Sequence, residues 1–207
     1  MKNKLGIITV ALFLVQLLVI FFSWMIAAAM PELSIHSLLS SEGIRWFFGS
    51  FARNQYPNIL IWSIMGSMAL GILYKSGLYN ALKHLLTIIF TTKRLSLHYQ
   101  QKVGLILVGI EMIAFIVIIV LLSLVPHAIL LSVLGELFPS SFASSIIPSI
   151  SFFIIIASIS YGYIVQSIRS YEIMYEFLTS GIKFLAYLFP LYFILNHLIA
   201  SIIFILK

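Results

Sequence analysis

The 207-residue chain contains no cysteine and no aspartate, and charged residues make up only 9% of it. The lack of cysteine excludes disulfides, thiolate nucleophiles and cysteine-ligated metals. The sequence also has no His-Glu-x-x-His motif, no Gly-x-Ser-x-Gly motif and no glycine-rich phosphate loop. We therefore predict that the protein is not an enzyme and that it uses no cofactor and no bound metal.

What the chain has instead is long apolar sequence, with 62% hydrophobic residues and a mean hydropathy of +1.14. Residues 5–29 form a run of 25 residues without a formal charge, and about 20 residues are enough to cross roughly 30 Å of hydrocarbon as a helix. Continuous apolar runs without two-residue alternation indicate helices and not a barrel. The prediction is an all-α, polytopic transmembrane helical bundle that forms a single integral membrane domain over residues 1–207.

The apolar runs and their breaks predict five or six spans. Five lie at about residues 5–29, 58–74, 103–124, 149–164 and 184–206. Interfacial amphipathic helices are expected in the aromatic segment 31–57 and in the basic segment 75–102. Residues 127–138 are short for a span, so we expect a re-entrant or interfacial segment there, with a sixth span as the alternative.

The distribution of the 12 Lys and Arg residues favours a cytoplasmic N-terminus in a cell inner membrane. With five spans, nine lie on the cytoplasmic side and three outside. The nine are Lys2, Lys4, Lys75, Lys83, Lys93, Arg94, Lys102, Arg169 and Lys183, and the three are Arg45, Arg53 and Lys207. If residues 127–138 cross the membrane, the bias becomes eight against four. The positive charge is thus explained by topology, and no nucleic-acid partner is expected.

Two stretches of the sequence carry a family resemblance. The first contains Gly43-Ile44-Arg45-Trp46-Phe47-Phe48, Asn58-Ile59-Leu60, Met65-Gly66-Ser67-Met68-Ala69-Leu70-Gly71 and Lys75-Ser76-Gly77-Leu78. The second contains Ile159-Ser160-Tyr161-Gly162-Tyr163 and the helix expected over residues 167–184. Together they resemble the interfacial helix, glycine-broken span and Tyr-Gly turn of the p-aminobenzoyl-glutamate transporter (AbgT) family.

The resemblance implies an inner-membrane secondary transporter that moves a small organic anion together with protons or sodium. The chain is less than half the usual family length and lacks the Ser, Asn and Asp residues of the family's re-entrant hairpin. It therefore resembles a short or truncated relative, with a homo-oligomer or a larger membrane partner completing the pathway between repeats. The alternative is a non-transporting membrane subunit that binds and stabilises a larger membrane complex.

Four polar residues in apolar surroundings are the candidate substrate or ion site. Glu111 lies about eight residues into a predicted span, where an ionisable group is costly and therefore needs a partner, a cavity or a proton. It is either a proton or cation site or a protonated carboxyl bonded to a neighbouring Ser or Tyr. Glu136 either enters the bundle on a re-entrant hairpin or lies at the outer surface. Asn196 and His197 either serve as secondary polar groups, with His197 relaying protons to Glu111, or make ordinary interhelical hydrogen bonds.

Overall fold

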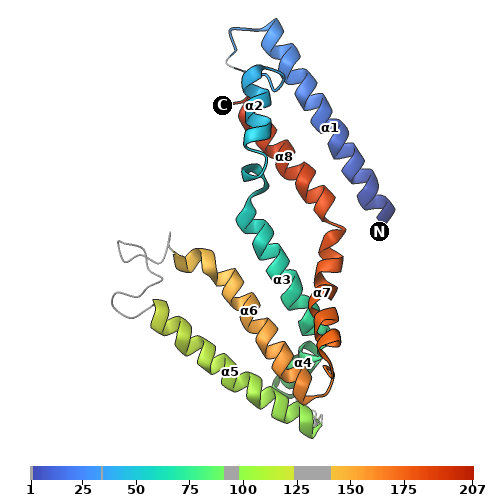
Figure 1. Cartoon of the computed structure of the whole chain (residues 1–207), viewed down its shortest axis with the longest axis vertical. Coiled ribbons are helices and arrows are strands. Elements are labelled where there is room, and N and C mark those ends of the chain that lie inside the picture. The colour runs from blue at the N-terminus through green and yellow to red at the C-terminus, as the bar shows by residue number, and fades with distance from the viewer. Residues whose placement is uncertain (1, 34, 91–97, 124–140) are drawn as a thin grey trace. The chain divides into compact units, whose positions relative to one another are not determined.

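A computed structural model describes residues 2–33, 35–90, 98–123 and 141–207, and these ranges are helical and contain no strand. Figure 1 shows the helices in chain order. They are α1 Lys2–Ala29, α2 Ser41–Gly49, the 3-10 helix η1 Arg53–Gln55, α3 Pro57–Lys75, α4 Leu78–Phe90, α5 Tyr99–Ser123, α6 Ser141–Ile164, α7 Tyr171–Ala186 and α8 Phe189–Ile205. The prediction of an all-α membrane protein with interfacial helices is confirmed for the fold class.

Four of the described helices are long and apolar enough to cross a membrane: residues 4–29 of α1, α3, α5, and residues 144–164 of α6. A fifth candidate span is obtained if α7 and α8 together make one crossing. The predicted re-entrant segment or sixth span at 127–138 lies outside the described residues. The described part of the chain thus accounts for four or five spans of a multi-pass membrane protein.

Two predicted helix boundaries were wrong, and a proline is involved in both. The helix expected over 167–184 extends to Ala186 as α7, so the span expected from residue 184 begins only at Phe189, as α8. Pro190 therefore occupies the first turn of α8, where a backbone N–H has no intrahelical partner in any case. Conversely, α6 begins eight residues before the predicted start and continues through Pro148. Membrane helices tolerate internal proline where serine hydroxyls or neighbouring helices satisfy the freed backbone groups.

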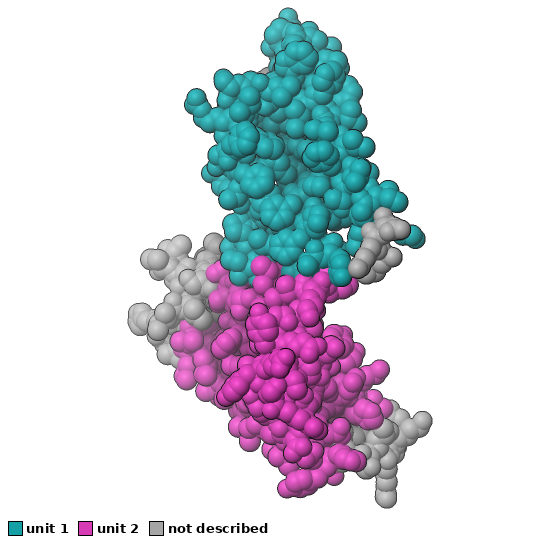
Figure 2. Space-filling model, turned by 45° about the vertical axis from the view of Figure 1, so that its right-hand side comes forward, with its two compact units in different colours: residues 1–61, 185–207 teal, residues 62–184 magenta. Residues whose placement is uncertain are grey.

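The chain divides into two compact units, which Figure 2 colours separately. Unit 1 comprises residues 1–61 and 185–207, and unit 2 comprises residues 62–184. Unit 1 contains α1, α2, η1 and α8, while unit 2 contains α4, α5, α6 and most of α3 and α7. The expectation of a single integral membrane domain stays a prediction.

The core of unit 2 is an α5–α6 helix pair with α4 packed against it. Its buried centre consists of Leu78, Ala81, Val108, Ala157 and Tyr161. Gly104 of α5 closely approaches the Tyr161 ring, since a Cβ at this position would lie 2.8 Å from a ring carbon. The helices of unit 2 thus approach one another through small residues and aliphatic or aromatic side chains, as is common in membrane bundles.

Small residues also set the contact between α3 and α7 inside unit 2. A Cβ on Gly71 would lie 2.5 Å from the backbone nitrogen of Gly181, and a Cβ on Gly181 would overlap the carbonyl group of Ser67. The following turn is fixed by Gly77, whose φ of +86° strains any residue with a side chain. Ser167, after α6, donates a hydrogen bond of 3.0 Å to the carbonyl oxygen of Ser76 in the same turn.

Candidate functional site

The candidate site in unit 1 is built on α8 and on the interfacial helix α2. Ser40 caps α2, because its Oγ accepts a 3.0 Å hydrogen bond from the backbone N–H of Gly43. Gly43 is buried, and a side chain there would overlap the backbone of Ser37 and Leu38. The cap and this close approach fix the start of α2 against the preceding segment.

His197 of α8 lies inside a cage of aromatic rings from α2 and the residues just after it. The ring centroids of Phe47, Phe51 and Trp46 lie 4.4, 5.0 and 6.4 Å from that of His197. The His197 side chain is buried, and neither ring nitrogen has a hydrogen-bond partner among the described residues. The imidazole is therefore packed against three aromatic rings, with Trp46 stacked, Phe51 tilted and Phe47 edge-on.

A second buried polar contact joins α1 to α8 in unit 1. The amide nitrogen of Gln16 donates a 2.9 Å hydrogen bond to Ser201 Oγ, and both side chains are buried. The Gln16 carbonyl oxygen has no partner among the described residues. Asn196, which precedes His197 on α8, is half-buried, and its amide nitrogen likewise lacks a described partner. Unit 1 therefore carries several polar groups along α8 whose hydrogen-bonding capacity is only partly used.

The sequence prediction missed Gln16, Ser201 and the aromatic cage. The signal for Gln16 was present, since it is an amide within the 25-residue apolar run of the first span. The sequence places the whole aromatic cluster Trp46, Phe47, Phe48 and Phe51 at the membrane surface. Three of its rings instead face His197, and Phe48 stays 74% exposed.

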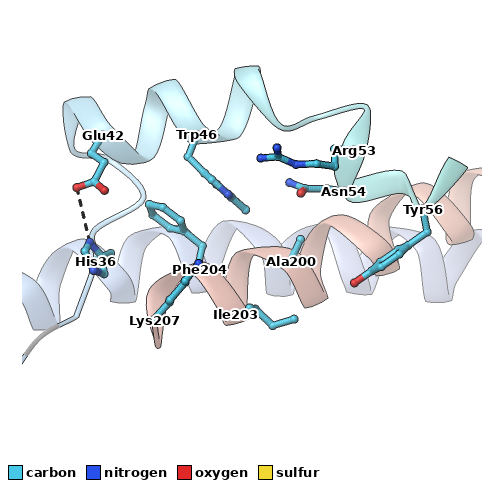
Figure 3. A pocket seen from close by; sticks show the side chains of 10 residues that line it. All are labelled: His36, Glu42, Trp46, Arg53, Asn54, Tyr56, Ala200, Ile203, Phe204 and Lys207. Atoms are coloured by element: carbon cyan, nitrogen blue, oxygen red, sulfur yellow. Dashed lines mark ion pairs between the residues drawn. The ribbon is translucent and has the colours of Figure 1, made fainter. Parts of the chain in front are cut away.

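A cavity of about 560 Å³ opens beside this cage and is lined only by residues of unit 1. In Figure 3, Trp46 and Arg53 approach it from the α2–η1 side, and Ala200, Ile203 and Phe204 belong to α8. The Trp46 and Phe204 rings stack with centroids 4.4 Å apart. The ionisable residues of the lining include Arg53, Lys207, Glu42 and His36, and Glu42 lies 3.7 Å from His36.

Glu111 lies on α5 in unit 2. Its side chain is half-buried, and its Oε2 atom is shielded and has no hydrogen-bond partner among the described residues. The hydroxyl of Ser158 on α6 is fully buried and also unpartnered within the described ranges. Because Glu111 belongs to unit 2 and Asn196 and His197 to unit 1, the structure brings only the latter two together within one unit. Glu136 lies outside the described residues.

These features define the class of the protein as a multi-pass helical membrane protein with polar groups buried in its apolar helices. A family model, described as the AbgT putative transporter family, matches residues 89–204, which is more than half of the chain. The chain belongs to this family of membrane transporters. No curated protein and no solved structure matches it.

The matched range covers the second of the two resembling stretches and all four candidate site residues. The first stretch, within residues 43–78, lies outside the match and stays a resemblance. Among the residues that the structure describes, no three His or Glu side chains are grouped closely enough to hold a metal ion.

Proposed function

We propose that the protein is a secondary transporter that moves a small organic anion coupled to protons or sodium, with Glu111 as the coupling carboxylate. The observation that carries this proposal is the shielded, unpartnered Oε2 atom of Glu111 in an apolar helix of a transporter family member. Holding an ionised group at depth costs on the order of 2.5–3.5 kcal/mol on insertion scales. A carboxylate that retains no compensating partner is suited to binding a proton or a cation and then releasing it.

Asn196 and His197 act as secondary polar groups in this proposal. Both lie on α8, and both have side-chain nitrogens without partners in the described part of the chain. A histidine exchanges a proton more readily near neutral pH than other side chains do. Glu136 is retained as a further candidate because it falls in the segment expected to re-enter the bundle.

The proposal also covers the membrane in which the protein resides and its assembly state. A multi-pass protein of this family resides in the lipid bilayer, and we place it in a cell inner membrane with a cytoplasmic N-terminus. We further propose that it works as a homo-oligomer or with a larger membrane partner. The mass of the purified complex in mild detergent tests this assembly.

The test of transport is a flux measurement in proteoliposomes driven by a pH jump, and in parallel by a sodium gradient. Glu111→Gln removes the ionisable group and keeps the size of the side chain, so we expect ion flux to fall at least tenfold. Glu176→Gln is the matched control, because Glu176 is exposed on α7 and should leave flux unchanged.

Two results would argue against the proposal. Equal flux in wild type and Glu111→Gln would show that this carboxylate does not couple transport. A copurifying larger protein, with no flux from either variant, would favour the alternative function of a membrane subunit that stabilises a larger complex.

A further inference from the structure

We propose that the cavity of unit 1 binds a phosphate oxyanion, and that its source is the headgroup of an anionic phospholipid. The cavity contains two cations, Arg53 and Lys207, against one carboxylate, Glu42. Neither cation has a carboxylate partner among the described residues, whereas Glu42 lies 3.7 Å from His36. The side chains of the lining therefore include one more cation than carboxylate.

The geometry around Arg53 suits a phosphate. Its Nη2 atom donates a 2.7 Å hydrogen bond to Ser50 Oγ, which anchors one side of the guanidinium. A guanidinium has five N–H donors, so the others are available for a phosphate, which arginine binds in a two-pronged fashion. The adjacent Asn54 also lines the cavity, and its amide nitrogen is buried and has no described partner. Figure 3 shows the Arg53 and Asn54 side chains next to each other.

The surroundings favour a lipid as the source of the phosphate. The cavity lies where α8 ends, beside a short helix whose Ile44 and Phe48 side chains are exposed, as expected at headgroup level. A separate apolar groove of about 160 Å³ is formed by α1, α2 and the segment before α2, and it is lined by Ile20, Leu38, Leu39, Ile44, Phe47 and Phe48. Unit 1 thus offers an oxyanion site and an apolar surface on the same interfacial helix, which matches the two parts of a phospholipid.

The binding test uses the full chain in a neutral detergent and native mass spectrometry. The probes are dioleoyl-phosphatidylglycerol, the zwitterionic dioleoyl-phosphatidylcholine and inorganic phosphate. We expect a clear preference for phosphatidylglycerol over phosphatidylcholine. Because hydrogen bonds to charged groups are strong, Arg53→Gln should weaken phosphatidylglycerol binding about tenfold.

Lys207→Gln is a second variant, and it breaks no hydrogen bond described within the fold. It should weaken binding in the same direction, so the test does not depend on Arg53→Gln being stable. Arg45→Gln is the matched control, because Arg45 belongs to α2 but does not line the cavity. Arg45→Gln should bind as the wild type does. If Arg45→Gln loses as much affinity for phosphatidylglycerol as Arg53→Gln does, binding is a general charge effect and the cavity is not the binding site.

The remaining outcomes distinguish a lipid headgroup from a soluble phosphate as the ligand. They also distinguish lipid binding at this cavity from transport. Equal binding of the two lipids overturns the proposal of an anionic-lipid site. Inorganic phosphate that binds through Arg53 without any lipid preference assigns the same oxyanion chemistry to a soluble ligand. Glu111→Gln should bind phosphatidylglycerol normally, so a failure of the transport proposal leaves this result unchanged.

Discussion

The two units differ in what their buried side chains are. In unit 1 the interior carries Gln16, Gln55, His197 and Ser201, several of which have unused hydrogen-bonding groups. In unit 2 the core is aliphatic, aromatic and glycine-lined, and Glu111 and Ser158 are its unpartnered polar groups within the described ranges. Close glycine packing occurs in both units, since Gly43 contacts backbone in unit 1 as Gly71 and Gly181 do in unit 2, but buried amide and imidazole side chains belong to unit 1 among the described residues. Substitutions that test buried polarity therefore belong in unit 1, and those that test helix packing belong in unit 2.

The largest effect is expected at the glycine contact of unit 2. Gly181→Val places a side chain where the backbone of Ser67 lies, and backbone cannot rotate away as a side chain can. Overpacking of this kind costs about 3 kcal/mol. Thermal unfolding followed by circular dichroism in detergent should show a large loss of stability or no folded protein.

Gly109→Val is the control for this prediction, because a Cβ on Gly109 meets nothing within 4 Å. The two glycines are both helical, so any difference between them reports packing. Similar stability of the two variants would contradict the close contact of α3 and α7.

A smaller effect, of opposite sign, is expected at the aromatic cage of unit 1. His197→Phe replaces a ring with two unpartnered nitrogens by an apolar ring of related shape, surrounded by Phe47, Phe51 and Trp46. Removing unsatisfied buried polar atoms should stabilise the folded state by about 1 kcal/mol. Transport should nevertheless fall, if His197 is a functional polar group.

His197→Ala separates packing from polarity in the same cage. It removes the nitrogens but also leaves a cavity, so it should destabilise the protein. If His197→Phe is less stable than wild type, its ring nitrogens do not destabilise the folded state. If it is also fully active in flux assays, transport does not need His197.

The smallest effect is expected for the Gln16–Ser201 hydrogen bond. Interhelical hydrogen bonds in membrane proteins average about 0.6 kcal/mol in double-mutant cycles. The cycle made of Gln16→Leu, Ser201→Ala and the double variant should give a coupling energy of that size in unfolding measurements. A coupling energy of zero would mean that α1 and α8 are held together by their apolar contacts alone.

The sequence predicted the long helices well because their signal is uniform. The predicted spans 5–29, 58–74 and 103–124 correspond to α1, α3 and α5 within a few residues. The amphipathic helix expected in the basic segment 75–102 is present as α4, in which Leu78, Leu82, Leu85 and Leu86 recur at helical spacing. Composition alone decides these elements, since each is apolar along its whole length or along one face.

The sequence was a poorer guide where a proline or a tertiary contact decides the structure. Pro190 lies in the first turn of α8, just after a helix break, as the local rule for proline allows, whereas Pro148 lies inside α6, where the same rule predicts a break. Whether a break occurs depends on whether neighbouring groups satisfy the freed backbone. Whether neighbouring groups do so depends on tertiary contacts, which a single sequence does not show.

The candidate site was predicted only in part for a related reason. Asn196 and His197 stood out as polar residues in an apolar helix, and the structure places both next to unpartnered or buried groups of unit 1. The rings that surround His197 come from α2 and the residues just after it, more than 140 residues away in sequence. Their orientation depends on how α2 packs on α8, which the aromatic composition of α2 does not specify.

The most direct test of Glu111 as the coupling carboxylate is an infrared difference spectrum of the protein in liposomes, recorded with and without the ion that drives flux. A carboxyl group that binds and releases a proton or a sodium ion changes its C–O stretching bands. We expect a carboxyl difference signal in wild type and in Glu176→Gln that disappears in Glu111→Gln. The same signal in all three proteins would show that Glu111 is a static group and that the coupling site lies elsewhere.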